Sequence, residues 1–178
     1  MILGMSTATY TVLHVLISLV GIGSGLIVML GFLTRRRMNK MTVLFLFTTV
    51  LTSVTGFGFP FDHLLPSHKV GLISLALLAI TIPARYSFHL TGAWRWIYVV
   101  TAAMALYLNV FVLVVQLFEK IPALKALAPT QSEAPFLISQ VVVLAIFFVL
   151  TILAVRRFHP EIAFSTEGMA GTSSKRAA

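Results

Sequence analysis

The chain has 178 residues, of which 58% are hydrophobic and 10% are charged. Soluble domains carry roughly a quarter charged residues, so this composition provides no aqueous surface and predicts an integral membrane protein. The formal net charge is +8, and the chain has no cysteine, which excludes disulfides, thiolate metal sites and cysteine nucleophiles.

Five stretches are long and apolar enough to cross a bilayer, which takes about 20 mostly apolar residues. They predict an all-α integral membrane bundle of five transmembrane helices within residues 1–158, followed by a disordered tail at 159–178. The predicted spans are residues 10–33, 41–60, 70–88, 96–118 and 136–155. The lipid bilayer is therefore the first expected partner.

Lysine and arginine predict the orientation, because short loops that are rich in them stay on the cytoplasmic side. The turns after the first and third spans, together with the C-terminal tail, hold ten of the 13 basic residues, and the other connections hold three. We therefore expect the N-terminus outside and the C-terminus in the cytoplasm. Because topology accounts for the net charge, nucleic acid is not an expected partner.

Small and polar side chains mark the faces by which membrane helices are expected to pack. In the first span, helical spacing places His14, Ser18, Gly21 and Gly25 on one stripe, and Gly21 and Gly25 form a GxxxG pair. This stripe predicts close packing of the first span against a neighbouring helix.

Further polar side chains fall toward the outer side of the bundle if the orientation is correct. They predict a polar interior that is open to that side, as in a ligand pocket, and the alternative is simple hydrogen bonding between helices. The predicted pocket residues are Ser18, Ser74, Asn109, Gln116 and Gln140.

Histidine is the side chain of this chain best suited to ligate haem or a transition metal. A b-type haem takes two axial imidazoles, and His14 with His68 is the best available pair. His14, His63, His68 and Asp62 have the ligand types for copper or zinc, although HxH and HxxxH spacings are absent. The alternative without a cofactor is a solvated loop beside one buried, hydrogen-bonded histidine.

Three segments resemble small, uncharacterised multi-pass proteins of the proteobacterial inner membrane: LHVLISLVGIGSGL, FTTVLTSVTGFGFPF and GAWRWIYVVTA. This resemblance extends over most of residues 10–158 and implies a bacterial inner-membrane location without a function. His14 followed by HKVG at 68–71 also resembles compact membrane proteins of cytochrome b type, which implies haem b, although a paired histidine within each of two spans is missing.

The preferred functional prediction is a non-enzymatic membrane protein that acts as an accessory or assembly subunit of a membrane complex. The chain has little mass outside the spans and contains no GxSxG, HExxH or P-loop motif. Other membrane subunits or a second copy of the chain are the expected partners. A small haem-binding redox protein is the first alternative. A small-ligand transporter or sensor is the second, and the lack of charged residues deep in the spans weighs against it.

Overall fold

The computed structural model of the chain describes residues 2, 4–59 and 66–159. Within these ranges the protein is helical and contains no strand, which confirms the predicted all-α fold. Its helices are α1 (Thr7–Leu33), α2 (Asn39–Gly56), α3 (Pro66–Tyr86), α4 (Trp94–Lys120), α5 (Pro122–Leu127) and α6 (Ala134–Arg157). The residues of the predicted tail after 159 lie outside the described ranges.

Four of these helices are long and apolar enough to cross a membrane. Each of the four overlaps one predicted span, and α2 overlaps the remaining one, at 41–60. α2 differs from the others because it has 18 residues and begins with the polar Asn39 and Lys40. The four candidate spanning segments are Thr7–Leu33, His68–Tyr86, Trp94–Lys120 and Ala134–Arg157.

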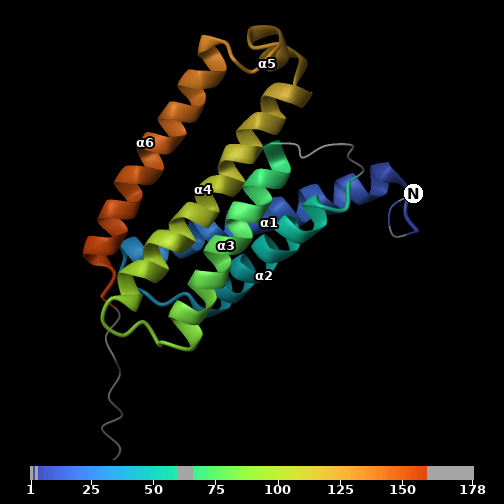
Figure 1. The fold of residues 1–178 in the computed structure, drawn as a ribbon. Helices are drawn as coiled ribbons and strands as arrows, with labels where there is room; N and C mark the ends of the chain where they lie inside the picture. The colour runs from blue at the N-terminus through green and yellow to red at the C-terminus, as the bar shows by residue number, and fades with distance from the viewer. Residues whose placement is uncertain (1, 3, 60–65, 160–178) are drawn as a thin grey trace, which may run out of the picture.

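The helices are arranged around α4, which contacts α1, α3, α5 and α6 (Figure 1). α4 and α6 form a long hairpin that is closed by α5, and α1 and α2 pack against each other at an angle to this hairpin (Figure 1). α3 contacts both α2 and α4 and so links the two parts. The helices converge at one end of the molecule, and the hairpin separates from α1 and α2 toward the other end, which we call the α5 end.

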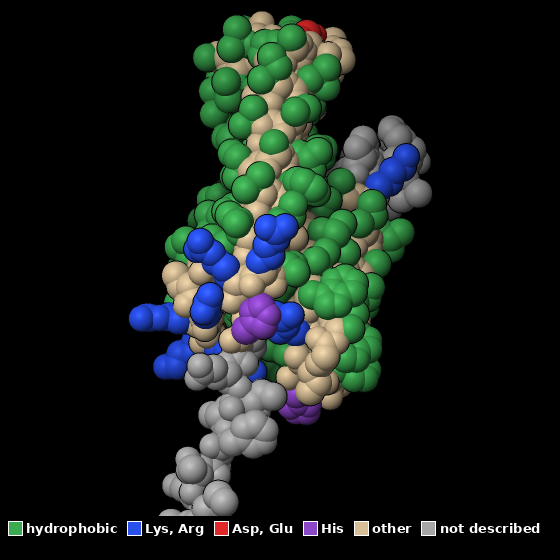
Figure 2. Space-filling view, turned by 90° about the vertical axis from the view of Figure 1, so that its left-hand side faces the viewer, with side chains coloured by type: hydrophobic (Ala, Val, Ile, Leu, Met, Phe, Trp, Pro, Cys, Tyr) green, Lys and Arg blue, Asp and Glu red, His purple; other side chains and the backbone are tan. Residues whose placement is uncertain are grey.

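The converging end is strongly basic, and we call it the basic end. It comprises the ends of α1, α3 and α6 and the starts of α2 and α4. Figure 2 shows lysine and arginine side chains gathered there, below a hairpin whose surface is almost entirely hydrophobic. The basic residues at this end are Arg35, Arg36, Arg37, Lys40, Arg85, Arg95, Arg156 and Arg157.

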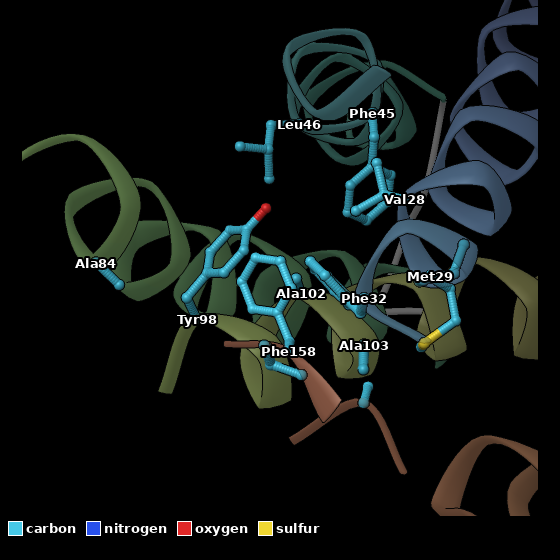
Figure 3. Close-up of a cluster of buried hydrophobic side chains, with 14 of the residues drawn as sticks. Val28, Met29, Phe32, Phe45, Leu46, Ala84, Tyr98, Ala102, Ala103 and Phe158 are labelled. Atoms are coloured by element: carbon cyan, nitrogen blue, oxygen red, sulfur yellow. The ribbon is translucent and has the colours of Figure 1, made fainter. Parts of the chain in front are cut away.

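Aromatic rings from three parts of the chain form the core near the basic end (Figure 3). The ring of Phe32 in α1 lies 5.5 Å from that of Tyr98 in α4, and Phe158, which follows α6, lies 4.8 Å from Phe32. Phe45 and Leu46 of α2 belong to the same cluster. Each of these side chains is buried, so this cluster joins α1, α2, α4 and the end of α6.

The predicted stripe on α1 is a packing face. Gly21 approaches Thr48 of α2 so closely that a Cβ atom at residue 21 would lie 3.2 Å from the threonine hydroxyl oxygen. A Cβ atom at Gly25 would lie 2.5 Å from Leu106 of α4 and 2.8 Å from the ring of Phe45. The small residues are therefore needed where three helices come together, which confirms the prediction from the GxxxG spacing.

Candidate functional site

His14 lies on α1 where this helix packs against the last turn of α2. Its Nδ1 is 2.8 Å from Oγ1 of Thr55. That hydroxyl has a single proton and lies 2.7 Å from the carbonyl oxygen of Leu51, to which it donates. We therefore assign Thr55 as the acceptor of a hydrogen bond from His14, an assignment that places the proton on Nδ1. In the neutral imidazole, Nε2 is then the nitrogen with a free lone pair.

His14 and His68 both lie beside the C-terminal end of α2. The ring of His14 meets Phe59 edge-on, with centroids 5.3 Å apart and planes at 89°. The ring of His68 stacks on Phe57, with centroids 5.5 Å apart and planes at 30°, and this histidine is buried. The two predicted haem ligands are thus held at the same end of the bundle by two different phenylalanines.

The other predicted metal ligands, Asp62 and His63, lie outside the described residues. Within the described ranges, no three histidine, aspartate or glutamate side chains lie close enough together to hold a metal ion. A haem or metal site that includes His14 and His68 therefore stays a prediction.

Two of the predicted pocket residues form hydrogen bonds within their own helices. The Ser18 hydroxyl donates to the carbonyl oxygen of His14 at 2.7 Å. Gln116 is exposed, and its Nε2 donates to Oε2 of Glu119 at 3.4 Å. Neither contact joins a second helix.

Two other pocket residues connect helices. Nδ2 of Asn109 in α4 donates to Oγ1 of Thr49 in α2 at 3.3 Å. Nε2 of Gln140 in α6 donates to the carbonyl oxygen of Phe111 in α4 at 3.2 Å. Hydrogen bonds of this kind contribute about 0.6 kcal/mol each in a membrane protein, so they fix helix register more than they add stability.

Three buried polar atoms have no hydrogen-bond partner among the described residues. They are Oγ1 of Thr52, Oγ of Ser74 and Oε1 of Gln140. Buried polar groups in proteins are normally paired, so these three oxygens are exceptions, and each is free to accept a hydrogen bond. Ser74 and Gln140 are only 2% and 8% exposed, so water has little access to donate a hydrogen bond to these oxygens.

The register between α3 and α4 places Ser74 at the level of Asn109. Oγ1 of Thr81 in α3 and Oγ1 of Thr101 in α4 are 2.8 Å apart. Because these helices are antiparallel, two helical turns from this contact toward the α5 end reach Ser74 on one helix and the neighbourhood of Asn109 on the other. The predicted pocket residues Ser74 and Asn109 are thus brought to one level, whereas Gln116 lies about two further turns along α4.

Polar contacts of two further side chains, Tyr10 and Arg85, were not predicted from the sequence. The Tyr10 hydroxyl donates to the carbonyl oxygen of Thr55 at 2.7 Å. Arg85 donates to Oδ1 of Asn39 at 2.7 Å and to the hydroxyl of Tyr98 at 3.2 Å, which joins α3 to α2 and α4. An arginine in the last turn of an apolar helix indicates that Arg85 needs polar partners. Which partners it finds depends on how the helices pack, and the sequence does not show this.

Comparisons with protein-family models, with curated proteins and with solved structures gave no match. The polar contacts described above that connect helices lie mostly between α1, α2, α3 and α4.

Proposed function

We propose that this chain is a non-enzymatic, five-span protein of the bacterial inner membrane that serves as an accessory or assembly subunit of a membrane complex. In this proposal the N-terminus and the α5 end face outward, and the basic end and the C-terminus face the cytoplasm. The concentration of lysine and arginine at the basic end supports this orientation.

The position of α2 supports the fifth span. Asn39 at its start is bonded to Arg85 at the end of α3, and Thr55 near its end is bonded to His14 near the start of α1. α2 thus lies alongside both neighbours over its length. Its 18 residues correspond to about 27 Å of helix, close to the hydrocarbon thickness of about 30 Å.

The surface of α6 carries the proposed role as a subunit. This helix packs against α4 and α1, and it buries Phe136, Gln140, Phe147 and Ala154. Its other side presents a stripe at helical spacing that contains Ile138, Val141 and Phe148, which are 61%, 63% and 66% exposed. Because one side of α6 is left uncovered by its own chain, this apolar side is available to pack against a helix of a partner protein.

The proposed role can be tested with two matched substitutions. Ala145 lies within the α6 stripe, and Ala76 on α3 is also an exposed alanine. After mild solubilisation, we expect the native chain to migrate with a larger complex on native electrophoresis, Ala145→Phe to release it, and Ala76→Phe to leave the complex intact. Migration of the native chain alone, or only as a homo-oligomer, would contradict the accessory role.

The tautomer of His14 favours a second candidate, a b-type haem protein. Histidines that ligate a metal usually donate their other ring N–H to a neighbouring acceptor, as Nδ1 of His14 does to Thr55. The optical spectrum of the purified protein tests this candidate. A Soret band that His14→Ala or His68→Ala abolishes would support it, and a colourless preparation without bound metal would exclude it.

A further inference from the structure

The ends of α1, α4 and α6 meet around Phe158 at the basic end. The ring of Phe158 lies 4.8 Å from that of Phe32, in the last turn of α1 (Figure 3). Nη1 of Arg95, in the first turn of α4, donates a hydrogen bond to the carbonyl oxygen of Phe158 at 2.7 Å. These contacts hold three helix ends together.

Six arginines lie on these three helix ends and form what we call the arginine cluster. One group follows α1, a second group ends α6, and one arginine begins α4. The members are Arg95 and the exposed Arg35, Arg36, Arg37, Arg156 and Arg157. Within the described part of the chain, the five exposed members have neither an ion pair nor a side-chain hydrogen bond.

Acidic side chains do not balance the arginine cluster. Glu119 and Glu133, the acidic residues within the described ranges, lie at the α5 end. Asp62, Glu161 and Glu167, which lie outside those ranges, can neutralise at most three of the six charges. Membrane topology explains why arginines gather on one side, but it does not require them to converge on Phe158. A bound anion would relieve their mutual repulsion.

We propose that the arginine cluster binds the phosphate groups of an anionic phospholipid, and that a lipid with two phosphates fits it best. A guanidinium group binds phosphate through two parallel hydrogen bonds. The cluster lies at the ends of helices that are long enough to cross a bilayer, and so at the depth of the headgroups. The separate arginine groups of α1 and α6 provide one position for each phosphate.

Apolar side chains next to the arginine cluster suit the acyl chains of the same lipid. Leu30 on α1 is 58% exposed, and Val149 and Leu153 on α6 are 53% and 37% exposed. All three precede the arginines by one or two helical turns, on helices that contact each other. A lipid bound by its headgroup would therefore lay its chains along α1 and α6.

The two tryptophans of the chain provide the measurement. Trp94 and Trp96 both lie at the start of α4, beside Arg95. The full chain, purified in mild detergent, is titrated with brominated diphosphatidylglycerol, phosphatidylglycerol or phosphatidylcholine, and quenching of tryptophan fluorescence reports binding. We expect the affinity to fall in that order, with phosphatidylcholine at least about tenfold weaker than diphosphatidylglycerol.

A variant of the exposed arginines tests the role of the cluster. Arg36, Arg37, Arg156 and Arg157 are replaced together by glutamine. Arg35 is kept because its φ of 60° lies in the left-handed region, and Arg95 is kept because it bonds to Phe158. Each replacement is expected to weaken diphosphatidylglycerol binding by about fivefold. The matched control, Lys120→Gln with Lys125→Gln at the α5 end, is expected to bind as the native chain does.

Three results would overturn the proposal: equal binding of the three lipids, equal weakening in the control, or displacement of the lipid by millimolar inorganic phosphate, which would indicate a general anion site. Circular dichroism checks that the variants keep their helices. If the arginine variant does not fold, the comparison of lipids on the native chain still decides the question. The proposal requires that the chain is embedded in a membrane, and it does not require the accessory role.

Discussion

Oγ1 of Thr55 accepts a hydrogen bond from Nδ1 of His14 at 2.8 Å, and this bond joins α2 to α1 away from the basic end. The threonine accepts rather than donates because its own proton is used by the carbonyl oxygen of Leu51. Loss of this acceptor would leave an N–H group of His14 unpaired in an apolar surrounding, and such a group is costly.

Replacement of Thr55 by valine should therefore destabilise the protein. We expect the free energy of unfolding to fall by about 1 kcal/mol, since interhelical hydrogen bonds in membrane proteins contribute about 0.6 kcal/mol on average and at most about 1.7. Unfolding by denaturing detergent, followed by circular dichroism, measures the change. Thr11→Val is the matched control, because Thr11 is exposed and donates only to Thr7 of its own helix. Equal losses in both variants would show that the bond to His14 adds nothing.

Substitution of Gly25 by alanine should weaken the packing of α1 against α2 and α4. The added Cβ would lie within 3 Å of both Phe45 and Leu106, and overpacking of this kind costs about 1–3 kcal/mol. Gly23 serves as the control on the same helix, because a Cβ there meets nothing within 4 Å. We expect Gly23→Ala to be neutral or slightly stabilising, since alanine favours helix more than glycine does. Thermal unfolding in detergent compares the two variants, and equal stability would contradict this packing.

Single cysteines can establish whether α2 crosses the membrane, since the native chain has none. Ala8 lies in the first turn of α1, and Ser132 lies in the connection between α5 and α6; both are exposed. With five spans, cysteines at these two positions react with a membrane-impermeant reagent from the same side, the outside. Ser87→Cys, at the basic end, is expected to react only after the membrane is opened. If α2 does not cross, Ala8→Cys and Ser132→Cys will react from opposite sides.

The turn that precedes α6 should be sensitive to acid, because it depends on the ionised side chain of Glu133. Desolvation raises the pKa of this carboxyl group, but hydrogen bonds from Thr130 and Ser132 outweigh it and hold the pKa below its ordinary value. A lowered pKa means that the ordered turn is stabilised above the ordinary pKa, and that this contribution is lost as the pH falls through the lowered value. Carbon NMR of labelled glutamate should show this low midpoint. Glu133→Gln should remove the pH dependence of the turn, and an ordinary midpoint would contradict the hydrogen bonds.

The sequence predicts the helices well because each depends on local properties. The stripe with Gly21 and Gly25 follows from helical spacing, and both residues are buried in the structure. Helix ends were less predictable: α1 begins at Thr7 because the Ser6 hydroxyl accepts from the backbone N–H of Thr9, so the helix extends beyond the apolar stretch. Pro122 begins the short helix α5, which lies between the predicted spans at 96–118 and 136–155.

The candidate site was harder to predict because it depends on how helices are tilted and in which register they pack. The sequence identified Asn109 and Gln140 as polar residues of the bundle interior, but it could not show that their partners are Thr49 and the backbone of Phe111. Depth alone grouped Gln116 with them, whereas this side chain bonds within α4.

The unequal lengths of the helices have a consequence for the surrounding bilayer. α2 corresponds to about 27 Å of helix, which is shorter than the hydrocarbon layer of about 30 Å. α4, with 27 residues, corresponds to about 40 Å, which is longer than this layer. In the proposed five-span arrangement, hydrophobic mismatch therefore has opposite signs on the two sides of the molecule. If α2 crosses the membrane as proposed, the bilayer would thin beside α2 and thicken beside the hairpin, or the protein would tilt, and either response would favour particular neighbours and membranes of particular thickness.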